Sequence, residues 1–292
     1  MSIRPRTSMK ATLENHESWR QLTSSELKKL QIEVLKKFAQ VCEKENLQFM
    51  LYYGSLLGAV RHKGMIPWDD DIDLCMMRES YDRLVNINWS TKNLKLISSV
   101  NHPDAPYPFT KISNTGTLFL ENQNYPVDDL GVNIDVFPLD YIPENPIRRG
   151  AEEFILKILK IILAAKVVKV SPERSTLKNV ILKTANLLFF LPSQRAIANT
   201  INSIASQARC PSAMIGCRVG PYGVKKDCFP EQHFRYVESI PFEDGVMPVP
   251  VSHDFVLTKL YGDYMTPPPD QSRNSHHDFK AYIKCDNAGG RH

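Results

Sequence analysis

Four aspartates within the five residues 69–73 are the feature that most limits what this chain can fold into. In an extended strand, Asp69, Asp71 and Asp73 share one face, with Ile72 and Leu74 on the other. Three carboxylates side by side repel one another unless a positive group lies among them. Mg²⁺ takes oxygen ligands, often one or two carboxylates plus phosphate oxygens, so two aspartates two residues apart can bind one ion. The alternative is a solvated acidic loop.

The residues just before the aspartates favour the metal interpretation. The apolar, β-prone run 49–53 is followed at once by Gly54, Ser55 and a helical stretch at 56–62. A strand that turns into a helix points backbone N–H groups at an anion, which is how helix starts bind phosphates. Glycine allows a phosphate to approach the backbone, and the Ser55 hydroxyl adds a hydrogen-bond donor. The sequence therefore predicts a phosphate cradle.

A phosphate cradle followed by a metal-binding strand is the layout of the nucleotidyltransferase fold. A third carboxylate from a separate strand is expected there, and Asp135 is a lone acid in the apolar run 132–137. Its burial would cost several kcal/mol if it were charged and unpaired. A metal ion would remove that cost, whereas a structural, hydrogen-bonded aspartate is the alternative.

The remaining patterns predict an α/β (α+β) protein, a nucleotidyltransferase-like mixed sheet flanked by helices with a basic helical insertion. A capping box, Thr23 with Glu26, starts a helix that continues to about residue 46. Strands are expected at 94–98, 109–113, 117–120 and 132–137, helices within 152–206 and at 252–261, and a polar tail after them. We divide the chain into a polar arm (1–22), a catalytic core (23–150), a basic helical insert (151–206) and a part that completes the catalytic domain (207–292).

Residues 52–74, from the cradle to the aspartates, resemble the signature of the LicD family. Further matches are Lys111 in its aromatic context, the run 133–140, the run 260–268, and His276 and His277. The resemblance spans residues 26–277 and is weak through the middle helices. LicD enzymes are phosphocholine transferases, and fukutin and fukutin-related protein are distant relatives.

The resemblance implies transfer of phosphocholine from CDP-choline to a sugar hydroxyl of a teichoic acid precursor or other cell-surface glycan, with release of CMP. It implies Asp71, Asp73 and Asp135 as ligands of Mg²⁺, with Mn²⁺ as an alternative, and Gly54 and Ser55 as the donor phosphate cradle. Another CDP-alcohol such as CDP-ribitol, a nucleotidyltransferase that uses CTP, and a catalytically silent binding protein remain alternatives.

Other side chains near the motif have roles that stay open. Asp69 is the first candidate for the catalytic base and Asp140 the second. Four cations are candidates for donor binding: Arg61, His62, Lys63 and Lys111. The alternatives are a favourable charge at a helix end for the first three and an exposed surface lysine for Lys111. Choline favours an aromatic cage, whose residues remain open among Tyr52, Tyr53, Trp68, Tyr107 and Phe109.

The positive charge of the chain is concentrated in one apolar segment. Residues 154–200 carry eight cations and one anion, whereas the whole chain has a formal charge of only +4. Lys157 and Lys160 fall on one side of a helix and Lys166 and Lys169 on the other, which predicts a kink or two separate surfaces. Residues 154–191 suit peripheral contact with a membrane that carries a lipid-linked glycan. A packed subdomain is the alternative, and nucleic acid is not expected.

The cysteines favour a reducing compartment. Six cysteines form no C-x-x-C pair, and the N-terminus lacks a cationic, apolar signal pattern. We therefore expect a cytoplasmic protein, peripheral on the inner face of the cell membrane. A structural Zn²⁺ held by Cys210, Cys217, Cys228 and His233 is a further hypothesis, with loosely spaced ligands, and buried free thiols are the alternative.

Overall fold

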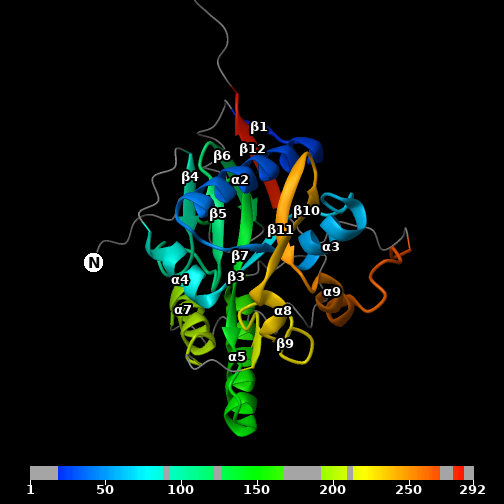
Figure 1. Ribbon diagram of the computed structural model, residues 1–292. Helices are drawn as coiled ribbons and strands as arrows, with labels where there is room; N and C mark the ends of the chain where they lie inside the picture. Colours follow the sequence, from blue (N-terminus) through cyan, green and yellow to red (C-terminus); the bar gives the residue numbers. More distant parts are fainter. Residues whose placement is uncertain are drawn as a thin grey trace, which may run out of the picture.

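The computed structural model describes residues 19–87, 93–121, 126–167, 192–208, 213–269 and 279–285, and a mixed sheet forms its centre (Figure 1). The strand order is β2 (Met50–Leu51), β3 (Asp73–Met77), β7 (Asn133–Tyr141), β5 (Thr110–Asn114) and β4 (Leu94–Ile97). β3 and β7 are parallel and the other neighbours antiparallel. Two short strands, β8 (Met214–Gly216) and β9 (Phe229–Pro230), continue from the end of β7. The predicted nucleotidyltransferase-like α+β fold is confirmed.

Helix α2 (Ser24–Lys44) lies across one face of this sheet (Figure 1). Its start is the predicted capping box: the Glu26 N–H donates to the Thr23 hydroxyl, and the Thr23 N–H donates to the Glu26 carboxylate at 2.9 Å. Leu35 and Phe38, three residues apart, are fully buried in the core. Each such side chain stabilises the fold by roughly 1.5–3 kcal/mol. The capping box therefore predicted where the helix begins, and Leu35 and Phe38 lie on the face that it buries.

A second sheet corrects the prediction for the C-terminal residues. β12 (Phe279–Lys284) lies between β1 (Trp19–Gln21) and β6 (Thr117–Glu121), antiparallel to both. The prediction of a polar tail is wrong here, and β1 falls within the predicted arm. Phe279 stacks on Phe119 with ring centroids 4.4 Å apart, and Ala281 is buried. The exposed Lys280 and Lys284 interrupt and end this apolar run, which is only six residues long and lies close to the C-terminus.

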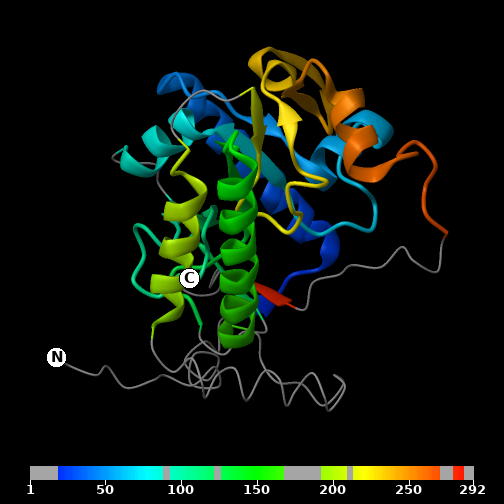
Figure 2. The same ribbon diagram turned by 90° about the horizontal axis from the view of Figure 1, so that it is seen from below.

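The helices differ from the predictions mainly at their ends. α3 (Tyr53–His62) begins three residues earlier than expected, directly after β2. α9 (His253–Tyr261) matches its predicted range. The predicted middle helices correspond in part to α5 (Pro146–Val167) and α7 (Gln194–Ala205), which lie side by side (Figure 2). Residues 168–191, where a further helix was predicted, lie outside the described residues. Four further elements were not predicted from the sequence: α4 (Arg78–Asn86), α8 (Gln232–Arg235), β10 (Val237–Phe242) and β11 (Gly245–Pro250).

Arg218 joins α5, α7 and the segment after β8. Its fully buried guanidinium donates to Glu152 at 2.7 Å and to Glu153 at 3.1 Å, both on α5. It also donates to the Ala205 carbonyl at the end of α7 at 3.1 Å. Ion pairs of this kind are stable only when each charge has a partner. This one fixes α5 against the rest of the protein.

Candidate active site

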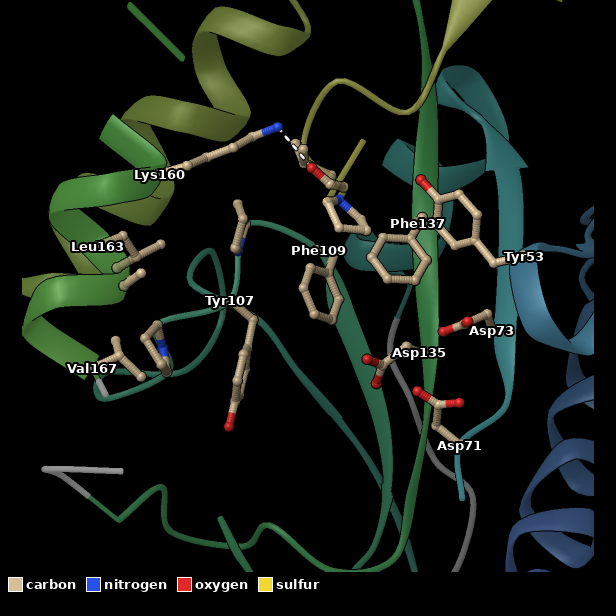
Figure 3. Close-up of a pocket in the computed structure, with 16 residues that line it drawn as sticks. Tyr53, Asp71, Asp73, Tyr107, Phe109, Asp135, Phe137, Lys160, Leu163 and Val167 are labelled. Atoms are coloured by element: carbon tan, nitrogen blue, oxygen red, sulfur yellow. Dashed lines mark hydrogen bonds between the residues drawn. The ribbon is translucent and has the colours of Figure 1, made fainter. Parts of the chain in front are cut away.

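The three predicted metal ligands lie together at the start of the parallel strand pair. Asp73 on β3 is opposite Asp135 on β7 in register, and Asp71 precedes β3 by two residues. All three line a cavity of about 460 Å³ (Figure 3). Parallel strands bring residues distant in sequence to the same edge of a sheet, which explains how Asp135 meets the aspartate motif. The structure therefore brings the predicted set into one site.

The local structure of the aspartate motif differs from the prediction. The strand begins at Asp73, so residues 69–72 form an irregular segment that follows a turn at Pro67 and Trp68. The Asp69 N–H donates to the Ile66 carbonyl at 3.0 Å, which closes the turn after Pro67. Potential ligand atoms of Asp69, Asp70 and Asp71 lie within 4.8 Å of one another. Of these three residues, only Asp71 lines the cavity.

Asp73 is half-buried among other carboxylates. Burial, together with the carboxylates of Asp71, Asp135 and Asp69, raises the pKa of Asp73 well above its usual range, and Lys111 opposes this shift. Raised carboxyl pKa values of this origin show that the site has more negative charge than its surroundings offset. Carboxylate oxygens are the ligands that Mg²⁺ and Mn²⁺ prefer. The donor set thus fits a divalent cation.

Lys111 on β5 faces this charge from the neighbouring strand. Its ammonium lies 2.8 and 3.1 Å from the two oxygens of Asp135 and 3.2 Å from the Asn133 oxygen. Burial alone would lower the pKa of Lys111, but the carboxylates of Asp135 and Glu121 raise it above its usual range. The alternative of an exposed surface lysine is therefore wrong. In this structure the ammonium binds a site carboxylate.

The start of α3 is fastened to the aspartate motif. The Ser55 hydroxyl accepts a hydrogen bond from the Asp73 N–H at 2.9 Å. A Cβ atom on Gly54 would lie 2.6 Å from a carboxylate oxygen of Asp69, so a larger residue would displace that side chain. Glycine is needed here because the start of the helix approaches the Asp69 side chain so closely. Both residues lie where the cradle was predicted, and their donor role remains a prediction.

The other predicted donor-binding cations lie at the opposite end of α3. Arg61 donates to the Tyr264 carbonyl at 2.7 Å and to the His62 ring at 2.9 Å. Lys63, in a left-handed conformation with φ of 60°, ends the helix. Arg61, His62 and Lys63 do not line the cavity with the aspartates. These contacts support their structural alternative, and their binding role remains a prediction.

Aromatic and aliphatic side chains form the rest of the cavity lining: Leu163 and Val167 of α5 lie across from the carboxylates, whereas Tyr53 and Phe137 lie next to them (Figure 3). Helix α5 contributes Lys160, Leu163, Ala164 and Val167, and the remaining lining residues are Tyr53, Pro106, Tyr107, Pro108, Phe109, Phe137, Val219, Gly220 and Pro221. Lys160 was predicted only as part of a basic, membrane-facing segment. Its ammonium donates to the Gly220 carbonyl at 2.7 Å at the edge of the cavity. Nothing in the sequence distinguished Lys160 from the other lysines of that segment.

Three further residues that the sequence offered as candidates do not line the cavity. Asp140 is buried in a paired ion contact with Arg78, at 2.6 and 2.9 Å, and does not line the cavity. This pairing supports a structural role for Asp140, and its role as a catalytic base remains a prediction. Tyr52 and Trp68 also do not line the cavity, whereas the other predicted aromatics do.

The zinc hypothesis stays a prediction. Cys217 and Cys228 are free thiols, and burial raises the pKa of both. In the described ranges, these cysteines and His233 do not gather into a group of three potential ligands. Cys210 lies outside the described residues, as do His276 and His277.

Residues 46–147 match the family model described as "LicD/FKTN/FKRP, nucleotidyltransferase domain". The chain therefore carries a LicD-family domain. This domain includes the start of α3, the aspartate motif, Lys111 and Asp135. The α5 residues that line the cavity lie beyond it. The predicted family resemblance is confirmed.

Whole-chain similarity extends the relationship beyond that domain. The chain is 28% identical over 275 residues to "Lipopolysaccharide cholinephosphotransferase LicD" of Haemophilus influenzae, covering 90% of this chain and 99% of that protein. Uncharacterized proteins of Rickettsia prowazekii and Rickettsia typhi are 40% and 43% identical over 55 and 56 residues, 19% of this chain and 21% and 18% of their own lengths. The similarity to LicD also confirms the prediction of a phosphotransferase.

Proposed function

We propose that this protein transfers phosphocholine from CDP-choline to a sugar hydroxyl of a cell-surface glycan and releases CMP. The observation that carries the proposal is the cavity that joins Asp71, Asp73 and Asp135 to an aromatic wall, which consists of Tyr53, Tyr107, Phe109 and Phe137. The carboxylates suit a metal-bound diphosphate, and the aromatic rings suit an organic cation. The name of the Haemophilus relative includes the same group transfer.

The aromatic wall favours choline over a polyol such as ribitol. Tyr53, Tyr107, Phe109 and Phe137 line the cavity (Figure 3). A quaternary ammonium gains from contact with ring faces and donates no hydrogen bonds. Ribitol hydroxyls would need hydrogen-bond partners to offset their desolvation. CDP-ribitol and CTP therefore rank behind CDP-choline as donors.

Asp71, Asp73 and Asp135 would hold Mg²⁺, or Mn²⁺ in its place, next to the start of α3. A bound Mg²⁺ would neutralise the charge of the donor diphosphate and stabilise the leaving group. Gly54 and Ser55 would donate their N–H groups to phosphate oxygens. Lys111 would keep Asp135 ionised and oriented, because its ammonium contacts both carboxylate oxygens.

The reaction is a substitution at the phosphorus that bears choline. An oxygen of the acceptor forms a new bond to this phosphorus while the bond to the bridging diphosphate oxygen breaks, and CMP leaves with that electron pair. The acceptor proton passes to a carboxylate. Asp69 remains the candidate for this step, because it lies against Gly54 and acts on Asp73 electrostatically.

The acceptor is proposed to be a lipid-linked glycan at the inner face of the cell membrane. The name of the Haemophilus relative favours a lipopolysaccharide over a teichoic acid precursor. The side of α5 away from the cavity exposes five apolar side chains: Ile147, Phe154, Ile155, Ile158 and Ile161. In the described ranges, none of the helices has the length and apolar character needed to cross a membrane. We propose peripheral contact through residues 154–191, as expected for an apolar helix face flanked by lysines.

Co-sedimentation with vesicles that contain anionic lipid tests this contact. We expect the wild-type protein to bind at low salt and the variant Phe154→Ser/Ile158→Ser to bind less, with an unchanged Tm because both side chains are exposed. Val246→Ser, at an exposed apolar position on β11, is the matched control. Absence of wild-type binding would overturn the membrane proposal and leave the catalytic one intact.

The catalytic proposal is tested by CMP release from CDP-choline in the presence of acceptor lipopolysaccharide or teichoic acid precursor. We expect release with Mg²⁺, none with EDTA, and recovery when Mg²⁺ is restored. CDP-ribitol and CTP are run in parallel. Turnover of either in place of CDP-choline would overturn the donor assignment, and donor binding without turnover would indicate a silent binding protein.

A further inference from the structure

The first residue of α3 has a strained backbone. Tyr53 has a φ of 40°, in the left-handed region that residues with a side chain rarely adopt, whereas Tyr52 before it is extended. The next two residues are Gly54 and Ser55, which contact Asp69 and Asp73. Strain of this kind persists only where the surroundings hold it in place. Contacts outside α3 must therefore hold Tyr53.

Asp227 provides those contacts from a distant part of the chain. Its carboxylate, in a residue only 1% exposed, accepts hydrogen bonds from the Tyr52 hydroxyl at 2.6 Å, the Tyr53 hydroxyl, and the Cys217 N–H at 3.2 Å. All three donors are neutral, so this carboxylate is buried at a cost that an ion pair would have reduced. A carboxylate only accepts, which suits two hydroxyl donors better than an amide.

The Tyr53 hydroxyl is confined from a second side. A Cβ atom on Gly220 would lie 2.5 Å from this hydroxyl, and the Gly220 carbonyl accepts the hydrogen bond from Lys160. The Tyr53 ring packs edge-on against Phe137, with centroids 5.5 Å apart, and lines the cavity. Its position is therefore set by the C-terminal part of the chain and by α5, while its backbone starts the cradle.

We propose that Asp227 is a positioning residue of the active site. Through the Tyr53 hydroxyl it holds the left-handed start of α3, and so fixes where Gly54 and Ser55 lie relative to the aspartates. Asp227 lies well beyond residues 46–147, so this contact joins the LicD-family domain to the rest of the chain. The inference rests on the proposed function, in which α3 binds the donor diphosphate.

The test compares Tyr53→Phe with Tyr52→Phe. Each variant removes one hydroxyl from the same carboxylate, but only Tyr53 is left-handed and lines the cavity. We expect similar losses in Tm. The KM for CDP-choline rises about tenfold in Tyr53→Phe, with a smaller change in kcat, and less than about twofold in Tyr52→Phe. Asp227→Asn, which keeps the shape of the side chain, should behave like Tyr53→Phe.

Hydrogen–deuterium exchange of the ligand-free proteins separates this inference from the proposed function. The Leu56 N–H donates to the Tyr52 carbonyl at 3.0 Å in the first turn of α3. We expect faster exchange over residues 53–57 in Tyr53→Phe than in Tyr52→Phe. Faster exchange without turnover of CDP-choline in the wild type would retain the positioning role and overturn the donor. Equal exchange and equal KM in the two variants would overturn the positioning role itself.

Discussion

Two clusters of buried charge in this protein are built in opposite ways. Around Arg218, one guanidinium lies between the carboxylates of Glu152 and Glu153 and also binds backbone carbonyls. At the cavity, Asp71, Asp73 and Asp135 converge on a site where burial and the neighbouring carboxylates raise the pKa of Asp73. The first cluster joins elements of the fold. The second has more carboxylates than the ammonium of Lys111 offsets, an excess of negative charge that the fold does not require.

The difference gives a way to separate structural from functional charges. Removal of one partner from the Arg218 cluster leaves an unpaired buried charge, which is strongly destabilising. Removal of one charge from the aspartate cluster relieves repulsion, so stability should hold or increase while activity is lost. Functional sites are known for perturbed pKa values of this kind.

The largest effect is expected for Asp73→Asn. Turnover should fall by about 10³-fold or more, since a loss of about 4 kcal/mol in transition-state stabilisation is typical of a lost electrostatic group. The Tm should stay equal or rise, because burial and neighbouring carboxylates disfavour the charged form of Asp73. CMP release and thermal unfolding are measured on the same preparation. Parallel losses of activity and Tm would make this carboxylate structural.

Arg218→Met should have the largest effect on stability. We expect a cost of about 3–5 kcal/mol in the free energy of unfolding, because Glu152 and Glu153 lose a fully buried partner. Arg148→Met is the matched control: it pairs with the same Glu152 from a half-exposed position and should cost less than about 1 kcal/mol. Urea unfolding measures both. Equal costs would show that burial does not decide the worth of these pairs.

The same contrast explains what could be predicted from the sequence. The cradle, Asp71 and Asp73 all lie within residues 54–73, and Asp135 stands out as an acid in an apolar run, so local patterns predicted which residues the fold brings together. Residues 69–72 were taken for part of a strand because alternation alone does not show that this segment follows a turn at Pro67 and is irregular. Asp227 and Lys160 were missed because their importance lies in contacts with residues far away in sequence. Buried tertiary partners leave no periodic signal.

Lys111→Met connects the two kinds of cluster. It removes the ammonium that contacts both oxygens of Asp135, so the aspartate site loses its own offsetting charge. We expect the metal-free protein to lose about 1–3 kcal/mol of stability and Mg²⁺ to restore most of it, since an ion bound to the native state stabilises it. Urea unfolding with and without Mg²⁺ measures this.

The double variant Lys111→Met/Asp135→Asn is its control. With both charges removed, the metal-free stability should recover most of the loss, because Asp135, whose two oxygens Lys111 contacts, no longer carries a charge. A double variant as unstable as Lys111→Met would mean that the lysine acts through packing against Tyr107 and Phe109 instead of through its charge.

The smallest effect is expected at the ion pair Arg20–Glu26, in which each charge has a partner but both side chains are exposed. Hydrogen bonds from Arg20 and from Thr23 lower the pKa of Glu26 to about 2. The folded pKa is below the unfolded one, so this contribution to stability is present above about pH 4.5 and is lost as the pH falls toward about 2. Glu26→Gln should therefore flatten the dependence of Tm on pH in this window and change little at pH 7, because solvent screens the exposed pair. Arg20→Gln should remove part of the same slope. If the dependence of Tm on pH is identical in the wild type and both variants, this exposed ion pair contributes nothing measurable to stability.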